Sequence, residues 1–318
     1  MKKLFISMLA IAALASCAKE EVIVADQGEL IGFNSFVENS TRAAVDPSYN
    51  ATNLKAFKVW GTVNGGNGLV SIFNGDNVTG NVGSTTVDGV TTPNIWNCDV
   101  KQYWIKDAIY NFAALVNPTT NLTLENGLPT EVKGFTANGT TDLLYARSAN
   151  NIVGKASGNG PVNFTFDHLL SKVKFTVINK STTAEQYSFK VNNITITGNS
   201  VGDVTLATKA WDNLGTSKAY NVAEIVVDKD TDAIKGAECA QELLLIPGTF
   251  SIAFNVDIYN GTTKLGSQAY PISPATFTAI LAAGNAYNFV INVAVGEEIT
   301  FSVTQEPTWA NGGSTTLI

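Results

Sequence analysis

Few side chains in this sequence are of the types that catalyse reactions. His168 is the only histidine, and it lies where a strand-like run ends. The segment Gly198-Asn199-Ser200-Val201-Gly202 has the G-x-S-x-G spacing of a hydrolase nucleophile elbow. That motif needs a strand-to-helix turn, with an acid and a histidine after the serine, whereas here strand-like runs flank the match and His168 precedes it. We therefore expect no enzyme activity and no catalytic residue, and a structural, hydrogen-bonding role for His168.

Metal ligands are equally scarce. Asp228, Asp230 and Asp232 alternate like the opening of a calcium loop, but the glycine and the terminal glutamate of an EF-hand are missing. Beyond the amino-terminal segment the chain holds Cys98 and Cys239, which with one histidine are too few for a zinc site. These two cysteines either pair in an oxidising compartment or stay free in the core. We expect no bound metal and no cofactor.

Charge and aromatic content narrow the range of partners. The net charge is −7, with 20 lysines and arginines, so a surface that neutralises phosphates is not expected and nucleic acid is excluded as a partner. Tryptophans can stack on sugars, but their scatter through strand-like sequence favours packing in a core, so no glycan site can be located. The five are Trp60, Trp96, Trp104, Trp211 and Trp309.

The amino terminus predicts export as a lipoprotein. Two lysines precede an apolar run over residues 4–14 that is too short to span a bilayer. Leu14-Ala15-Ser16-Cys17 then resembles a bacterial lipobox, in which the cysteine is acylated, for example with palmitate, and becomes the new terminus. Residues 1–16 are therefore expected to be a signal peptide. Lipid on Cys17 is expected to anchor the chain in the outer membrane.

Alternation of apolar and polar residues predicts β-strands along most of the chain. Asparagine–glycine pairs lie between these runs, and Asn260-Gly261 predicts a hairpin while Asn126-Gly127 marks a further turn. The clearest alternating runs cover residues 162–166, 173–177, 252–258, 289–295 and 299–303. We therefore expect an all-β protein built from antiparallel sandwiches.

A stretch rich in glycine, serine and asparagine at residues 150–161 is the expected domain boundary. It divides the chain into an amino-terminal sandwich over residues 43–158 and a carboxy-terminal sandwich over residues 159–318. Residues 17–42 precede both and are expected to form a propeptide that contains a first strand.

That propeptide ends in a candidate processing site. Residues 30–37 are strand-like, with Ile31, Phe33 and Val37 on one face, and a polar stretch follows before Arg42 and Ala43. An arginine in a polar loop is a natural cleavage site for a trypsin-like protease. Spacing alone does not distinguish it from a surface arginine without a role.

Several motifs resemble the Mfa-like fimbrillins, which are subunits of type V pili. The run Val162-x-Phe164-x-Phe166-x-His168-x-Leu170-Ser171-Lys172-Val173 is similar to the F-x-H-x-LSKV motif of that family and is the strongest match. Weaker matches cover residues 142–146, 243–247, 284–289 and 299–303, the last followed by Trp309. The chain is thereby identified as a fimbrillin-like lipoprotein precursor.

The resemblance implies two transthyretin-like β-sandwich domains in tandem and a structural role in a surface pilus, or fimbrium, that supports cell adhesion. Cleavage between Arg42 and Ala43 would remove the anchor and the first strand, and a strand of the next subunit would fill the groove by donor-strand exchange. Ile299, Phe301 and Val303 have the alternation that a donor strand needs. The implied partners are other pilus subunits, a trypsin-like processing protease, the outer membrane before cleavage, and a host or glycan ligand.

A second interpretation stays open at this point. A cell-surface lipoprotein or adhesin that binds glycans and remains anchored, without polymerising, would carry the same features over most of the chain. The tail after Trp309 is short, and the position in a fibre as stalk, anchor or tip is not determined by these motifs.

Overall fold

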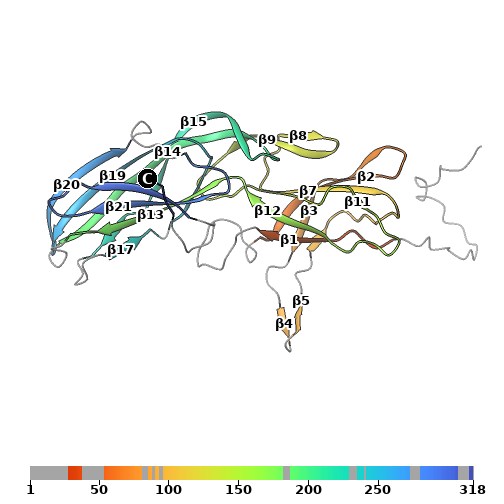
Figure 1. Cartoon of the computed structure of the whole chain (residues 1–318), viewed down its shortest axis with the longest axis horizontal. Coiled ribbons are helices and arrows are strands. Elements are labelled where there is room, and N and C mark those ends of the chain that lie inside the picture. Colours follow the sequence, from red (N-terminus) through yellow and green to blue (C-terminus); the bar gives the residue numbers. More distant parts are fainter. Residues whose placement is uncertain are drawn as a thin grey trace, which may run out of the picture.

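The computed structural model describes residues 28–37, 54–80, 85–87, 90–92, 96–181, 187–228, 235–239, 241–272, 280–306 and 315–317. All regular structure in these ranges is β-strand, which confirms the all-β prediction. No helix capable of crossing a membrane occurs in these ranges. Figure 1 shows an elongated molecule with two lobes, with most of the amino-terminal strands at one end and the carboxy-terminal strands at the other.

The amino-terminal lobe is built on an eight-stranded sheet. Its order is β1-β12-β10-β7-β2-β3-β6, and β11 also pairs with β7. The strands are β1 (Phe33–Val37), β2 (Ala56–Asn64), β3 (Leu69–Gly80), β6 (Trp96–Cys98), β7 (Ile109–Val116), β10 (Leu144–Arg147), β11 (Ile152–Val153) and β12 (Val162–His168). A separate hairpin of β4 (Thr85–Val87) and β5 (Val90–Thr92) extends from this lobe (Figure 1).

Two further sheets make up the carboxy-terminal lobe, and one end of the larger sheet extends over the amino-terminal lobe (Figure 1). The seven-stranded sheet has the order β20-β19-β14-β9-β8, with β15 and β16 also paired to β14. Its strands are β8 (Leu122–Glu125), β9 (Leu128–Thr136), β14 (Tyr187–Thr205), β15 (Ala210–Val222), β16 (Ile225–Val227), β19 (Phe250–Asn260) and β20 (Thr263–Ile272). The six-stranded sheet has the order β17-β13-β21-β22-β23, with β18 paired to β13. Its strands are β13 (Ser171–Asn179), β17 (Lys235–Glu238), β18 (Leu243–Leu245), β21 (Ala286–Val293), β22 (Thr300–Glu306) and β23 (Thr315–Leu317).

Three groups of buried side chains hold the sheets together. The first sheet encloses a core rich in phenylalanine, which includes the fully buried Phe112. The other two sheets share a second core around Phe175, and a third core that includes Trp60 lies where the lobes meet. Both faces of β7 are therefore covered, since its side chains contribute to the first core on one face and to the third on the other. This explains why residues 112–116 form a continuous buried apolar run.

On both sides of the expected boundary at residue 158, the chain contributes strands to the sheet of the other lobe. β12 follows that boundary, yet it pairs with β10 and β1 of the first sheet. The β8–β9 hairpin precedes the boundary, yet β9 pairs with β14 of the second sheet. Paired strands on both sides therefore connect the two lobes.

Hairpin turns form at the asparagine–glycine pairs at residues 126–127 and 260–261, as the sequence predicts. The expected hairpin at Asn260-Gly261 is confirmed, because β19 and β20 pair antiparallel with Asn260 opposite Thr263. In the β8–β9 hairpin, Asn126 and Gly127 have φ angles of 50° and 76°. Two positive φ angles in succession are the requirement of a type I′ turn, which suits the twist of a hairpin.

The two described cysteines are free thiols that lie in different cores. Cys98 is buried in the phenylalanine-rich core of the first lobe, and Cys239 is buried in the second core. Burial raises the pKa of the Cys98 thiol, which disfavours the reactive thiolate. Of the two alternatives that the sequence left open, the structure has the unpaired one.

Candidate functional site

The amino-terminal strand β1 occupies a seat at the edge of the first sheet. It pairs in parallel with β12, and Phe33 lies opposite Val162. The Val162 N–H donates to the Gly32 carbonyl at 2.8 Å. On the other side, an antiparallel bridge joins Leu30 to Tyr103. Backbone groups therefore hold residues 28–37 from two directions.

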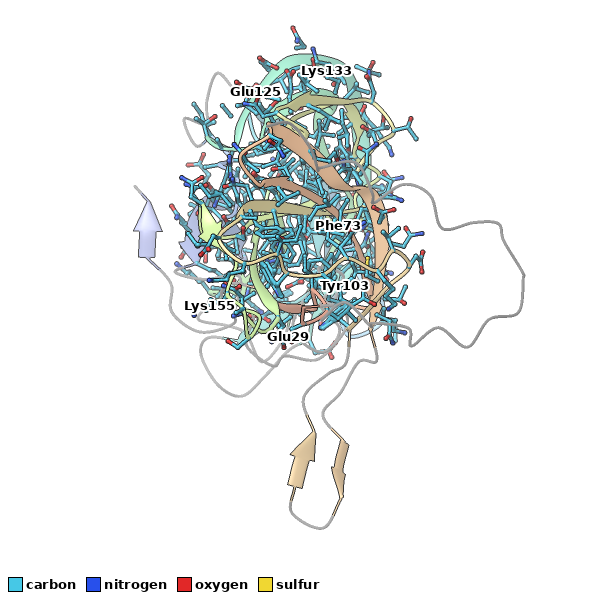
Figure 2. The ribbon with its side chains drawn as sticks, turned by 90° about the vertical axis from the view of Figure 1, so that its right-hand side faces the viewer. Glu29, Phe73, Tyr103, Glu125, Lys133 and Lys155 are labelled. Atoms are coloured by element: carbon cyan, nitrogen blue, oxygen red, sulfur yellow. The ribbon has the colours of Figure 1, made fainter. Side chains whose placement is uncertain are left out.

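Glu29 ties the start of this segment to two loops. Its carbonyl accepts a hydrogen bond from the Trp104 N–H at 3.0 Å, and its carboxylate accepts one from the Gly160 N–H at 3.1 Å. Figure 2 shows Glu29 and Tyr103 near one another at the lower rim of the lobe. Charge-assisted bonds of this kind are stronger than neutral ones, so Glu29 helps to fix the register of the strand that follows.

Phe33 fills the middle of the aromatic core. Its side chain is 3% exposed, and its ring stacks on Phe164 at 5.9 Å and meets Phe73 edge-on at 5.4 Å. Two further phenylalanine rings lie at 6.3 Å. Ile31 is also 3% exposed, and burying two such side chains stabilises the seated segment by about 1.5–3 kcal/mol each. If β1 left, an apolar groove would open beside β12.

The expected donor residues lie in the carboxy-terminal lobe, where Phe301 and Val303 belong to a paired strand and Ile299 lies just before it. β22 pairs with β21, with Phe301 opposite Ile291 and Val303 opposite Phe289. Val303 is 1% exposed, and Ile299 and Phe301 pack against the second core. β23 pairs with the outer side of β22 through three residues and forms the edge of the sheet.

The predicted lipidation and processing residues Cys17, Arg42 and Ala43 lie outside the described residues, and so does Trp309. The sequence holds one other arginine, Arg147. It lies in β10, where its backbone pairs with Ala113 of β7. The backbone of Arg147 is therefore held in a paired strand.

His168 and Asp142 form a buried pair where β12 lies beside β10. His168 Nδ1 is 2.6 Å from Asp142 Oδ2, and the two side chains are 4% and 0% exposed. The other carboxylate oxygen of Asp142 accepts the Leu143 N–H at 2.9 Å. The hydrogen-bonding role expected for His168 is thereby confirmed. Its partner was not identified from the sequence, since 26 residues separate the two.

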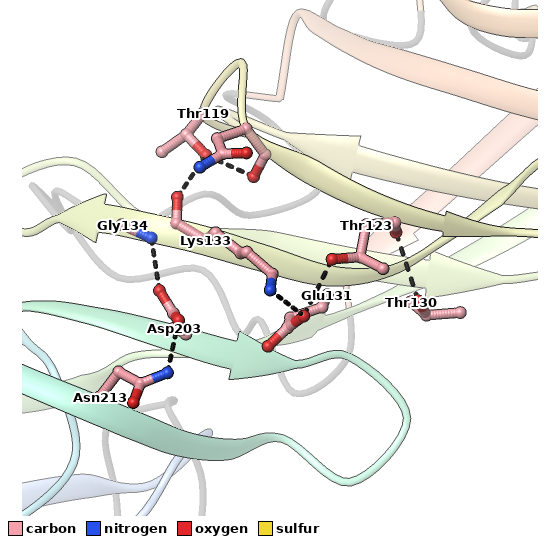
Figure 3. A network of polar contacts seen from close by, with 9 residues as sticks. Thr119, Thr123, Thr130, Glu131, Lys133, Gly134, Asp203 and Asn213 are labelled. Carbon is pink, nitrogen blue, oxygen red and sulfur yellow. Dashed lines mark hydrogen bonds and ion pairs between the residues drawn. The ribbon is translucent and has the colours of Figure 1, made fainter.

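A group of carboxylates lies at the crossing of β9 and β14. Among the described residues, Glu131, Asp203 and Asp212 each offer an oxygen atom within 4.8 Å of the others. The Asp203 carboxylate accepts the Gly134 N–H at 2.6 Å and the Asn213 amide at 2.8 Å (Figure 3). These hydrogen bonds hold the pKa of Asp203 below its usual value. The network therefore fastens β9 to β14.

A family model described as fimbrillin-like matches residues 41–307. The chain belongs to the fimbrillin-like family. The family predicted from the motifs around His168 is thus confirmed. The matched range of this fimbrillin-like chain includes neither β1 nor β23.

Solved structures share the fold of this fimbrillin-like chain. A fimbrial protein from Bacteroides vulgatus is 16% identical with a TM-score of 0.56, and the match covers 88% of this chain and 99% of that one. A candidate cell adhesion protein from Bacteroides uniformis is 15% identical with a TM-score of 0.51, covering 87% and 97% of the two chains. No curated protein matches the chain in sequence.

Proposed function

We propose that this chain is a structural subunit of a type V surface pilus, exported as a lipoprotein on Cys17 and trimmed after Arg42. Its family, and its fold likeness to a fimbrial protein and to a candidate cell adhesion protein, support a role in a fimbrium or in adhesion at the cell surface. A trypsin-like protease that cuts between Arg42 and Ala43 would separate the anchor and β1 from the rest of the chain.

The seat of β1 is the observation that carries this proposal. β1 is an edge strand whose apolar anchors, Ile31 and Phe33, are buried in a core made by the rest of the lobe. Once the chain is cut, noncovalent contacts alone retain β1. Its departure leaves unpaired backbone groups on β12 beside an apolar groove, and a strand with apolar residues at alternate positions fits such a groove. The resulting head-to-tail contact does not close on itself, so it propagates a filament.

The carboxy-terminal strands are the proposed donors. β23 is an edge strand with a three-residue ladder, so its release breaks few backbone bonds. β22 has a longer ladder with β21, and its residues Phe301 and Val303 contribute to the second core. We therefore expect β23 to leave first, and Ile299, Phe301 and Val303 to enter the groove of the next subunit if β22 follows.

The two arginines make the processing step testable with an arginine-specific protease. We expect Arg147 to resist cleavage, because its backbone pairs with Ala113 of β7 and proteases cut backbone that can leave its hydrogen-bonded partners. Digestion of the full chain should therefore create one new terminus, at Ala43, and the product should form multimers that resist mild denaturant. Edman sequencing identifies the terminus, and size-exclusion chromatography in low urea follows the multimers.

An Arg42→Ala variant is the matched control and should stay uncut and monomeric. A cleaved wild-type chain that remains monomeric with β1 bound would show that polymerisation is wrong for this protein. Sequencing of the protein from intact cells separates the two interpretations of the sequence. A terminus at Ala43 supports the pilus subunit, whereas a blocked, acylated Cys17 supports the adhesin that remains anchored.

A further inference from the structure

A polar cavity lies between the β8–β9 hairpin and one face of the first sheet. Its volume is about 470 Å³, within the range of about 300–1,000 Å³ that is usual for small-molecule sites. Thr62 of β2, Asn111 of β7 and Arg147 of β10 line it on the sheet side. Glu125 and Asn126 line it from the hairpin. With Leu69 of β3, Leu128 and Thr130 of β9, and the loop residues Asn150 and Asn151, the cavity has walls from six strands and two loops.

The local sequence of the hairpin builds this cavity. Gly127 has a φ of 76°, and a Cβ atom placed on it would lie 2.8 Å from Thr62 Cγ2. Only a glycine therefore allows the turn to approach β2 so closely. On the sheet side, Thr62 pairs with Asn111, and Arg147 pairs with Ala113 two residues further along β7. Since paired strands hold the backbone at these positions, the framework that carries the polar side chains is formed before any ligand arrives.

Neutral amides and hydroxyls dominate the lining. The Asn111 amide donates to Asn151 Oδ1 at 3.3 Å, while the Asn151 N–H donates to Asn111 Oδ1 at 2.9 Å. These two bonds orient both side chains at the cavity wall. Asn126 and Asn150 add further amides, and each amide both donates and accepts hydrogen bonds. A ligand that matches this lining carries many groups that also donate and accept, and sugar hydroxyls do so.

Thr62 supplies a second observation. The residue is 2% exposed and lines the cavity, and its hydroxyl forms no hydrogen bond with any other described residue. The hydroxyl oxygen is not one of the fully buried side-chain atoms that lack a partner, so it is open to the cavity and a ligand can reach it. A ligand hydroxyl in the cavity would provide a partner for it.

We infer that this cavity binds a saccharide, with Thr62, Asn111 and Arg147 as the residues that contact it. The opposite charges of Arg147 and Glu125 offset one another, so a hydroxyl-rich ligand fits the site better than a simple anion. Leu69, which is 47% exposed, and Leu128 add apolar surface for the carbon face of a sugar ring.

The saccharide site is separate from the seat of β1. Glu125 lies at the upper rim of the lobe in Figure 2, and Glu29 lies at the lower rim. The cavity therefore stays open whether β1 is present or exchanged, and saccharide binding does not depend on polymerisation.

Titration of the full chain with free saccharides, followed by NMR of the side-chain amides, tests the inference. The probes are galactose, glucose, mannose, fucose, N-acetylglucosamine and N-acetylneuraminic acid. At least one should shift the side-chain amide signals of Asn111 and Asn151. Thr62→Val keeps the shape of the side chain and removes the hydroxyl, so it should weaken binding about three- to tenfold. Thr62→Ser should bind like the wild type.

Thr79→Val is the matched control. Thr79 is exposed in β3 and does not line the cavity, so this variant should bind with unchanged affinity. The inference is overturned if none of the six probes shifts the amide signals. It is equally overturned if Thr62→Val binds as tightly as Thr62→Ser. The unfolding midpoint of each variant shows whether any loss of binding comes from a loss of folded protein.

Discussion

Replacing Phe33 by alanine should loosen β1 in its seat while leaving the rest of the lobe intact. The side chain is 3% exposed and its ring contacts four other phenylalanine rings. Truncating a buried phenylalanine costs about 3–5 kcal/mol, which includes the cavity that is left behind. Each aromatic contact adds about 0.5–1.5 kcal/mol, so we expect the cost of Phe33→Ala to lie toward the upper end of the range for such a truncation.

Urea unfolding before and after proteolysis measures this effect. In the uncut full chain, Phe33→Ala should lower the free energy of unfolding by about 3–5 kcal/mol. After cleavage at Arg42 and separation of β1 in low urea, the variant and the wild type have the same sequence and should unfold at the same urea concentration. Multimers should also form sooner from the cut variant, because its β1 leaves the groove more easily.

Phe73→Ala provides the comparison that makes this result interpretable. Phe73 is 1% exposed in the same aromatic core, but it lies in β3, which processing does not remove. Its loss should therefore destabilise the protein both before and after cleavage. The reasoning is refuted if Phe33→Ala remains less stable than the wild type after cleavage, or if it forms multimers no faster. Either result would mean that β1 stays in its seat.

Three further predictions concern the body of the protein. Asp142→Ala removes the buried carboxylate that His168 contacts and should lower stability by about 1–3 kcal/mol in urea unfolding; an unchanged midpoint would contradict a structural role for the pair. Gly127→Ala forces an alanine into the left-handed region against Thr62, which should cost about 1–2 kcal/mol or more in the same assay. Backbone and amide hydrogen bonds lower the pKa of Asp203, so its contribution to stability is present above the unfolded pKa of about 3.9 and is lost as the pH falls through the lower folded value. Asp203→Asn should therefore flatten the acid side of a plot of unfolding midpoint against pH, and an unchanged profile would contradict this assignment.

Local patterns in the sequence predicted the elements of this fold well. Alternation identified β12, in which Val162, Phe164 and Phe166 are each 4% or less exposed, as the strand pattern requires. The hairpin at Asn260-Gly261 followed from residue type alone, because glycine readily accepts a positive φ and Gly261 has a φ of 58°. The family followed from the motif around His168. Each of these features depends on residues within a few positions of one another.

The pairing of these elements could not be predicted in the same way. Alternation shows that a strand has an inner face, but it does not specify the neighbouring strand, which depends on packing across the whole chain. β12 was therefore expected to begin the second sandwich, although it pairs with β10 and β1 in the first sheet. For the same reason, the sequence did not predict that Asp142 is the partner of His168.

The sequence by itself determined that this chain is a β-protein of the fimbrillin-like family with a strand-like segment ahead of Arg42. The tertiary structure alone decided that this segment fills an aromatic core beside β12, and that Thr62, Asn111 and Arg147 meet beneath a glycine turn. These residues come from separate strands, and none of them belongs to a local motif. Their proximity results from the order of strands in the sheet, which is set by the summed burial of side chains from distant parts of the chain.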